Sequence, residues 1–182
     1  ENPVDAAVKW CDEGAMFLHV VDLDGAFSGT LTNASIIGDI CEAVDIPVEV
    51  GGGIRSEEAI ETYLEAGVNR VIIGSKAVED PKFITAMAKK YGSSLAVSID
   101  AKGDVVATRG WVDGRDKKVL PFAQSMLDIG INTLVYTDIS RDGMLTGPNF
   151  EMLSQLQQLP FIRLIASGGM SSIDDLKKLQ AM

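Results

Sequence analysis

Short apolar runs alternate with amphipathic stretches along this chain, and each apolar run is followed by acidic, glycine or serine residues. Six runs predict strands, at residues 17–22, 47–50, 70–73, 95–99, 133–137 and 162–166. Because these runs are apolar at successive positions, they are typical of parallel strands that are covered by helices.

The stretches between the runs predict helices. Their residues are 35–44, 56–67, 81–90, 121–130, 149–158 and 172–182, and another helix runs from residue 2 or 5 to residue 14. Ser56 is an N-cap candidate with acidic residues in the following turn, and Pro81 and Pro121 fit the first position of a helix. This alternation predicts an α/β fold, either a barrel or an open sheet.

An internal repeat decides between these two folds. Residues 22–56 match residues 138–172 with an offset of 116, pairing Asp22 with Asp138, Gly52-Gly53 with Gly168-Gly169, and Ser56 with Ser172. Asp24 matches Asp142 with an offset of 118. A duplicated unit of about four strand–helix modules is half of a (β/α)₈ TIM barrel. We therefore expect residues 1–182 to form a single incomplete barrel domain that holds strands two to seven, without strands one and eight.

Charge and cysteine content narrow the function classes. The net charge of −10 argues against nucleic acid as a partner, but a small phosphorylated substrate is compatible with it. Cys11 and Cys41 lack metal-site spacing and fit small buried residues in a reducing compartment. With no signal peptide and no apolar run near the ~20 residues of a membrane helix, we expect a cytoplasmic protein without a membrane partner.

Glycine-rich turns follow several of the predicted strands. The candidate phosphate-binding residues in these turns are Gly52, Gly53, Arg55, Gly74, Ser75, Ser167, Gly168 and Gly169. Glycine lets the backbone approach an anion, and a following helix N-terminus supplies N–H donors. Two such sites at matched repeat positions predict a substrate with a phosphate at each end. The alternative is that the glycines only form tight turns.

Two carboxylates at strand ends are candidates for acid–base catalysis. Asp100 and Asp142 follow the predicted strands five and six, and Thr137 could donate a hydrogen bond beside them. The alternative is that both aspartates cap helices or form loop ion pairs. No metal-ligand cluster, nucleotide fingerprint or nucleophile–base pair occurs in the sequence, so acid–base chemistry on a sugar phosphate, without metal or cofactor, is the simplest class.

Several other residues receive separate expectations. Asp22 and Asp138 are expected to be structural, and His19 to be a core or helix-facing residue. Arg109 and Trp111 lie on the connection after the fifth strand. There an arginine could clamp a carboxamide or phosphate and a tryptophan could stack on a heterocycle, or the loop could simply pack onto the barrel.

Six segments together resemble one family. They are HVVDLDGA (19–26), VGGGIR (50–55), IGSKAV (73–78), RGW (109–111), TDISRDGMLTGPN (137–149) and ASGG (166–169). They resemble the phosphoribosylformimino-5-aminoimidazole carboxamide ribotide isomerases of histidine biosynthesis. The resemblance covers the whole chain.

The resemblance implies a cofactor-free Amadori rearrangement, from aminoaldose to aminoketose, by a monomeric intramolecular oxidoreductase. It implies that an aspartate of strand one, outside this chain, removes the C2 proton. Asp142 matches the general acid that opens the ribose ring, Asp100 matches an aspartate that has also been given that role, and Thr137 matches a supporting threonine. Without the strand-one base, residues 1–182 alone are expected to be inactive.

Two related enzymes are the alternatives. The sister cyclase, imidazole glycerol phosphate synthase, shares the half-barrel repeat and an aspartate equivalent to Asp100. The bifunctional histidine/tryptophan isomerase shares Arg109 and Trp111, but it usually carries an arginine near residues 28–30, where this sequence has Ser-Gly-Thr. The monofunctional isomerase is therefore preferred.

Overall fold

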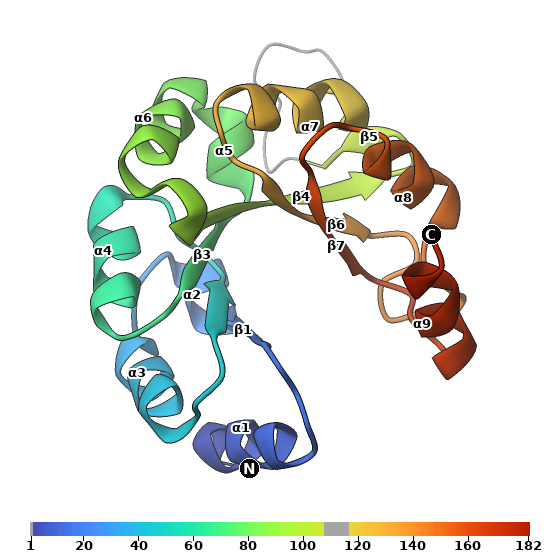
Figure 1. Ribbon diagram of the computed structural model, residues 1–182. Helices are drawn as coiled ribbons and strands as arrows, with labels where there is room; N and C mark the ends of the chain where they lie inside the picture. Colours follow the sequence, from blue (N-terminus) through green and yellow to red (C-terminus); the bar gives the residue numbers. More distant parts are fainter. Residues whose placement is uncertain (1, 108–116) are drawn as a thin grey trace. The chain divides into compact units, whose positions relative to one another are not determined.

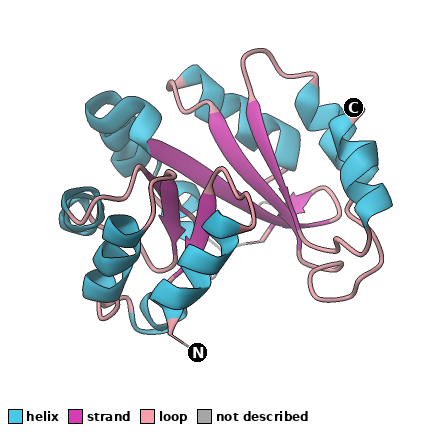
Figure 2. Cartoon of the chain, turned by 60° about the horizontal axis from the view of Figure 1, so that its bottom comes forward, coloured by secondary structure: helices cyan, strands magenta, loops and turns pink. Residues whose placement is uncertain are grey.

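The computed structural model of the chain describes residues 2–107 and 117–182 (Figure 1). The chain divides into two compact units between Lys76 and Ala77. In both units, strands alternate with helices along the chain, as Figure 2 shows by colour.

The first unit contains three parallel strands. Its elements are α1 (Pro3–Asp12), β1 (Leu18–Val21), α2 (Leu23–Ser28), α3 (Ala34–Ala43), β2 (Val48–Gly51), α4 (Glu57–Glu65) and β3 (Arg70–Ile73). β2 pairs with β1 and with β3 in parallel register, so Val50 lies opposite both Val20 and Val71. The carboxyl ends of the three strands therefore lie at one edge of the sheet, where the glycine turns begin.

The two faces of this sheet have different surroundings. Leu18, Val20 and Val48 pack with Ala7 of α1 and Ile40 of α3. Because side chains alternate along a strand, the residues between these positions point to the opposite face.

His19 is one of the residues on that opposite face. Its side chain is 43% exposed and its Nδ1 lies 2.8 Å from Oε1 of Glu49. The expectation of a core or helix-facing histidine is therefore wrong. The flanking apolar residues Leu18 and Val20 belong to the other face of the strand, so they gave no indication of where the imidazole lies.

The second unit repeats the pattern. After α5 (Ser75–Glu79), which begins in the first unit, come α6 (Pro81–Tyr91), a 3₁₀ turn (Gly92–Ser94), β4 (Leu95–Lys102), β5 (Val105–Val106), α7 (Val119–Asp128), β6 (Thr133–Asp138), α8 (Phe150–Gln157), β7 (Arg163–Ser167) and α9 (Ile173–Gln180). β6 is parallel to both β4 and β7, and the short β5 pairs antiparallel with β4.

Parallel strands alternating with helices confirm the prediction of an α/β chain built as an incomplete (β/α)₈ barrel. Most boundaries agree with the sequence analysis to within a few residues. Pro121 is an exception, because α7 begins at Val119 and the proline occupies its third position. None of the described helices has the length and apolar character needed to cross a membrane. That residues 1–182 form one domain stays a prediction.

Candidate active site

Three candidate residues form a row at the carboxyl ends of β4, β6 and β7. The parallel register places Asp100 opposite Thr137, and Thr137 opposite Ser167. The Thr137 hydroxyl donates a hydrogen bond to the Asp100 carboxylate. The strands thus bring an acid, a hydroxyl donor and the start of a glycine turn together at the sheet edge where barrel enzymes hold their active sites.

Asp142 lies close to this row, on the loop that follows β6. Its negative charge acts on Asp100. A β-carbon built onto Gly168 would lie 3.6 Å from Cβ of Asp142 and 3.2 Å from Cγ2 of Thr137. Among the described residues, the Asp142 carboxylate makes no side-chain hydrogen bond, so its oxygens are available to a substrate.

The pKa of Asp100 is raised above its usual value. Desolvation by the surrounding protein is the largest cause, and repulsion from Asp142 adds to it, while the Thr137 hydrogen bond acts in the opposite direction. The residue still reaches solvent at the sheet edge. Asp100 therefore keeps its proton to a higher pH than a free aspartate does, and it can exchange that proton.

Asp22 is buried, and both of its carboxylate oxygens accept hydrogen bonds. It is 2% exposed and accepts hydrogen bonds from the Gly25 N–H at 2.9 Å, Nδ2 of Asn33 at 2.7 Å and the Tyr63 hydroxyl at 2.7 Å. Burial alone would raise the pKa of Asp22, but these bonds outweigh it and the pKa is lowered. The carboxylate joins α2, α3 and α4 to the end of β1, which agrees with the expected structural role.

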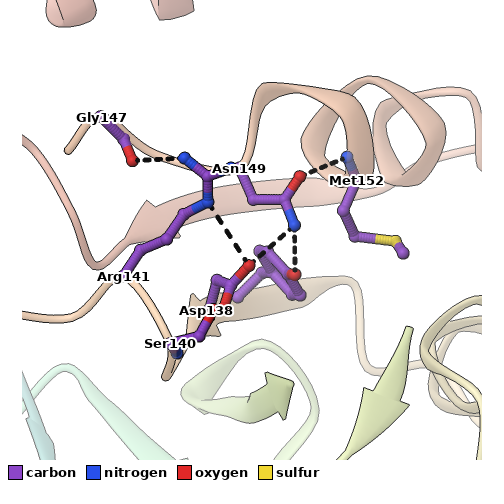
Figure 3. Close-up of polar contacts among 7 residues, drawn as sticks. Asp138, Ser140, Arg141, Gly147, Asn149 and Met152 are labelled. Carbon is purple, nitrogen blue, oxygen red and sulfur yellow. Dashed lines mark hydrogen bonds and ion pairs between the residues drawn. The ribbon is translucent and has the colours of Figure 1, made fainter. Parts of the chain in front are cut away.

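Asp138 occupies the matching position in the second unit (Figure 3). It is 3% exposed and accepts hydrogen bonds from the N–H and Oγ of Ser140 and from Nδ2 of Asn149. Burial again opposes ionisation, and the hydrogen bonds together with Arg141 lower the pKa of Asp138. This aspartate is also structural, as expected.

The glycine turn after β2 packs directly onto the loop after β1. Gly52 and Gly53 have positive φ angles of 121° and 67°. A side chain at Gly52 would collide with the carbonyl of Asp22, and one at Gly53 with the carbonyl of Gly25. Tight loop packing alone thus explains these two glycines, and phosphate binding by them stays a prediction.

Two other candidates of the first unit lie at the same sheet edge. Gly74 and Ser75 follow β3, which pairs with β2, so their turn leaves the strand beside the Gly52 turn. The exposed Arg55 reaches toward the loop after β1, where a side chain at Gly29 would lie 3.8 Å from its Nη1.

The turn after β7, in the second unit, is also a glycine turn that packs closely against a neighbouring loop. Gly168 and Gly169 have φ angles of 83° and 79°. A side chain at Gly169 would lie 2.5 Å from the carbonyl oxygen of Gly147, whose N–H donates to the Gly169 carbonyl at 2.8 Å. The repeat seen in the sequence is therefore a repeat of loop packing.

Comparison with known proteins identifies the family. A family model described as "Histidine biosynthesis protein" matches residues 1–182. The chain belongs to this histidine biosynthesis family. Relatives occur in Listeria monocytogenes serotype 4a (49% identity; 98% of this chain, 75% of the relative), Oceanobacillus iheyensis (45%; 100% and 75%) and Bacillus cereus strain B4264 (50%; 100% and 76%). All three are named as isomerases of an imidazole-4-carboxamide that bears a phosphoribosyl and a phosphoribosylamino group.

Charge is distributed unevenly in this histidine biosynthesis family member. Residues 1–76 contain 14 of the 26 acidic and four of the 16 basic residues, so they carry the whole net charge of −10. Lys9 pairs with Glu13, and Arg70 pairs with Glu49. Arg55 lies in the turn after β2, and Lys76 lies in α5, which follows β3.

A polar cluster that sequence reasoning missed lies on the face of β1–β3 opposite α1 and α3. Glu49 is 2% exposed and bridges His19 to Arg70, whose Nη2 lies 2.6 Å from Oε2 of Glu49. Burial opposes ionisation, but the two partners lower the pKa of Glu49. The available signal was a lone glutamate between Val48 and Val50 within an apolar run.

Two predicted substrate residues, Arg109 and Trp111, lie outside the described residues. Within residues 2–107 and 117–182, no group of histidine, cysteine, aspartate and glutamate residues could hold a metal ion.

Proposed function

We propose that the protein is an aldose–ketose isomerase of histidine biosynthesis that acts on a bis-phosphorylated aminoimidazole carboxamide ribotide by an Amadori rearrangement. Family membership and the printed names of the relatives support the reaction and the substrate. The structural observation that carries the proposal is the cluster of Asp100, Thr137 and Asp142 beside the Gly168 turn.

Two proton transfers begin the rearrangement, before the resulting enaminol gains a proton at C1 and loses one from its C2 hydroxyl to give the aminoketose. An acid gives a proton to the ribose ring oxygen as the C1–O bond breaks, and a base takes the proton from C2. The raised pKa of Asp100 and the unbonded carboxylate of Asp142 suit the acid step, since two close carboxylates retain a proton more readily than one does. Thr137 orients Asp100 through its hydroxyl.

The glycine turns are proposed to bind the two phosphates. One group is formed by Gly52, Gly53, Arg55, Gly74 and Ser75, and the other by Ser167, Gly168 and Gly169. The φ angles of Gly52, Gly53, Gly168 and Gly169 are those at which a side chain is disfavoured. Arg109 and Trp111 are proposed to contact the substrate as well. Monomeric state, cytoplasmic location, and the absence of nucleic-acid and membrane partners stay predictions.

An assay of the whole protein tests this proposal. Conversion of the aminoaldose ribotide to the aminoketose is expected without added metal or cofactor. If the protein instead consumes the ketose when it is supplied with ammonia, it is the cyclase. If it also isomerises the corresponding tryptophan-pathway substrate, it is the bifunctional enzyme.

The pH dependence of kcat separates the two candidate acids. The activity of an enzyme that needs a protonated acid falls as that acid ionises at high pH, and removing the acid removes that fall along with most of the rate. Asp100→Asn and Asp142→Asn are therefore compared over the same pH range. The variant that loses the alkaline decline identifies the general acid.

A further inference from the structure

The loop that carries Asp142 is fastened at both ends by a single side chain. Arg141 lies 3.7 Å through its Nε from Oδ2 of Asp138, at the end of β6. Its Nη1 donates a hydrogen bond of 3.2 Å to the Gly147 carbonyl, near the end of the same loop. Figure 3 shows the guanidinium lying between these two acceptors. The side chain of Arg141 thus links the two ends of the loop that contains Asp142.

The anchor to which Arg141 binds is itself buried and hydrogen-bonded. Asp138 is buried and its oxygens accept three hydrogen bonds from Ser140 and Asn149. Asn149 also accepts a hydrogen bond from the Met152 N–H and so caps α8. The orientation of the guanidinium is therefore fixed by β6 and α8 rather than by the loop alone.

The same arginine lies against the proposed phosphate turn. A side chain at Gly169 would lie 3.0 Å from Cβ of Arg141, and Gly168 faces Cβ of Asp142 in the same way at 3.6 Å. The Gly147 N–H donates to the Gly169 carbonyl, so the residue that binds Nη1 also binds the turn. Asp142 cannot shift relative to the turn unless these contacts rearrange.

We propose that Arg141 is a positioning residue, which holds the Asp142 carboxylate at a fixed place relative to the substrate phosphate bound by the Gly168–Gly169 turn. This inference rests on the proposed function. Arg141 does not touch the reacting atoms; it acts through Asp142. A displacement of a catalytic acid by about 1 Å is enough to lower a rate by roughly 100-fold, so contacts that hold Asp142 in place affect the rate.

Steady-state kinetics of Arg141→Lys in the whole protein test this role. Lysine keeps the positive charge but has one nitrogen in place of the two, Nε and Nη1, through which Arg141 contacts Asp138 and Gly147. We expect kcat to fall by about 10–100-fold while KM changes by less than about threefold, because the phosphate turn is still present. Arg163→Lys is the matched control, since Arg163 is exposed at the opposite end of β7 and its activity is expected to be unchanged.

A double-mutant cycle distinguishes positioning from general destabilisation. In an Asp142→Asn background, Arg141→Lys is expected to have no further effect on kcat, because the group that it positions is gone. A second loss of the same size, or an unchanged kcat in Arg141→Lys alone, would overturn the inference. If the unmodified protein does not isomerise the aminoaldose at all, the proposed function fails instead.

Discussion

The loops after β1 and β6 share one framework but use it differently. In each, a buried aspartate ends the strand and an asparagine 11 residues later donates to it, Asn33 to Asp22 and Asn149 to Asp138. In the first loop, Nδ2 of Asn33 also donates a hydrogen bond of 2.9 Å to Oδ2 of Asp24. Asp142 is the repeat counterpart of Asp24, and its carboxylate makes no side-chain hydrogen bond among the described residues.

Loop fastening differs in a corresponding way. The position before Asp142 is Arg141, which binds both ends of its loop, while the position before Asp24 is Leu23, which is 64% exposed. In the loop after β1, the Asp24 carboxylate itself takes part in the hydrogen bonds that hold the loop. In the loop after β6, Arg141 makes the holding contacts and the Asp142 carboxylate stays unbonded. A reactive carboxylate must stay free of structural bonds, so this difference supports the proposal that the second half of the repeat supplies the acid.

The largest expected effect separates the two counterpart aspartates. Asp142→Asn removes one of the two candidate proton donors and is expected to lower kcat by roughly 10²–10⁴-fold. Asp24→Asn changes an exposed hydrogen bond and is expected to leave kcat within about twofold. Steady-state rates of both variants at one pH measure the difference. An equal loss of kcat in both variants would mean that Asp24 and Asp142 both take part in catalysis, and that their different hydrogen bonding does not separate a structural from a reactive carboxylate.

Much of this framework was predictable from the sequence, because local patterns encode it. Strand ends follow from apolar runs, and Ser56 and Ser172 cap α4 and α9 as their positions in the sequence suggest. The repeat offset paired Asp22 with Asp138, and both are structural.

Long-range contacts were not predictable in the same way. The contact of Arg141 with Gly147 depends on the conformation of one loop, and the Glu49 cluster requires residues from three strands. Neither of these contacts produces a periodic pattern in the sequence. α2 was also missed, since Gly25 within its six residues is typical of a turn.

The next effect concerns how tightly the two glycine turns are packed. Gly52→Ala is expected to lower the free energy of unfolding by about 3 kcal/mol or more, because its φ of 121° and the carbonyl of Asp22 both exclude a side chain. Gly168→Ala meets the Asp138 carbonyl only at 3.2 Å and is expected to cost about 1–2 kcal/mol.

Urea unfolding of the two variants measures this difference. Gly103→Ala is the control, since Gly103 has a φ of 63° with open space around it, and only the backbone cost of about 1 kcal/mol is expected. If Gly52→Ala costs no more than Gly103→Ala, the turn after β2 is not held by close packing.

The smallest expected effect compares the tyrosines beside the two buried aspartates. The Tyr63 hydroxyl donates to Asp22 at 2.7 Å, and the pKa of Tyr63 is raised by burial and by that carboxylate. The Tyr136 hydroxyl only accepts a 3.4 Å bond from Asn149, and burial together with the charge of Asp138 raises the pKa of Tyr136 to about 12. Tyr63→Phe is expected to cost about 2 kcal/mol at pH 7, and Tyr136→Phe about 0.5 kcal/mol.

The cost of Tyr63→Phe should depend on pH. The pKa of Asp22 in the folded protein is lowered, so its ionised form contributes stability above the unfolded pKa of about 4, and that contribution is lost as pH falls through the folded pKa. Without the tyrosine hydroxyl, the folded pKa moves back toward 4. The difference in unfolding free energy between Tyr63→Phe and the unmodified protein should therefore be largest at neutral pH and shrink below pH 4. A cost that does not vary between pH 7 and pH 3 would mean that Tyr63 stabilises the fold by packing alone.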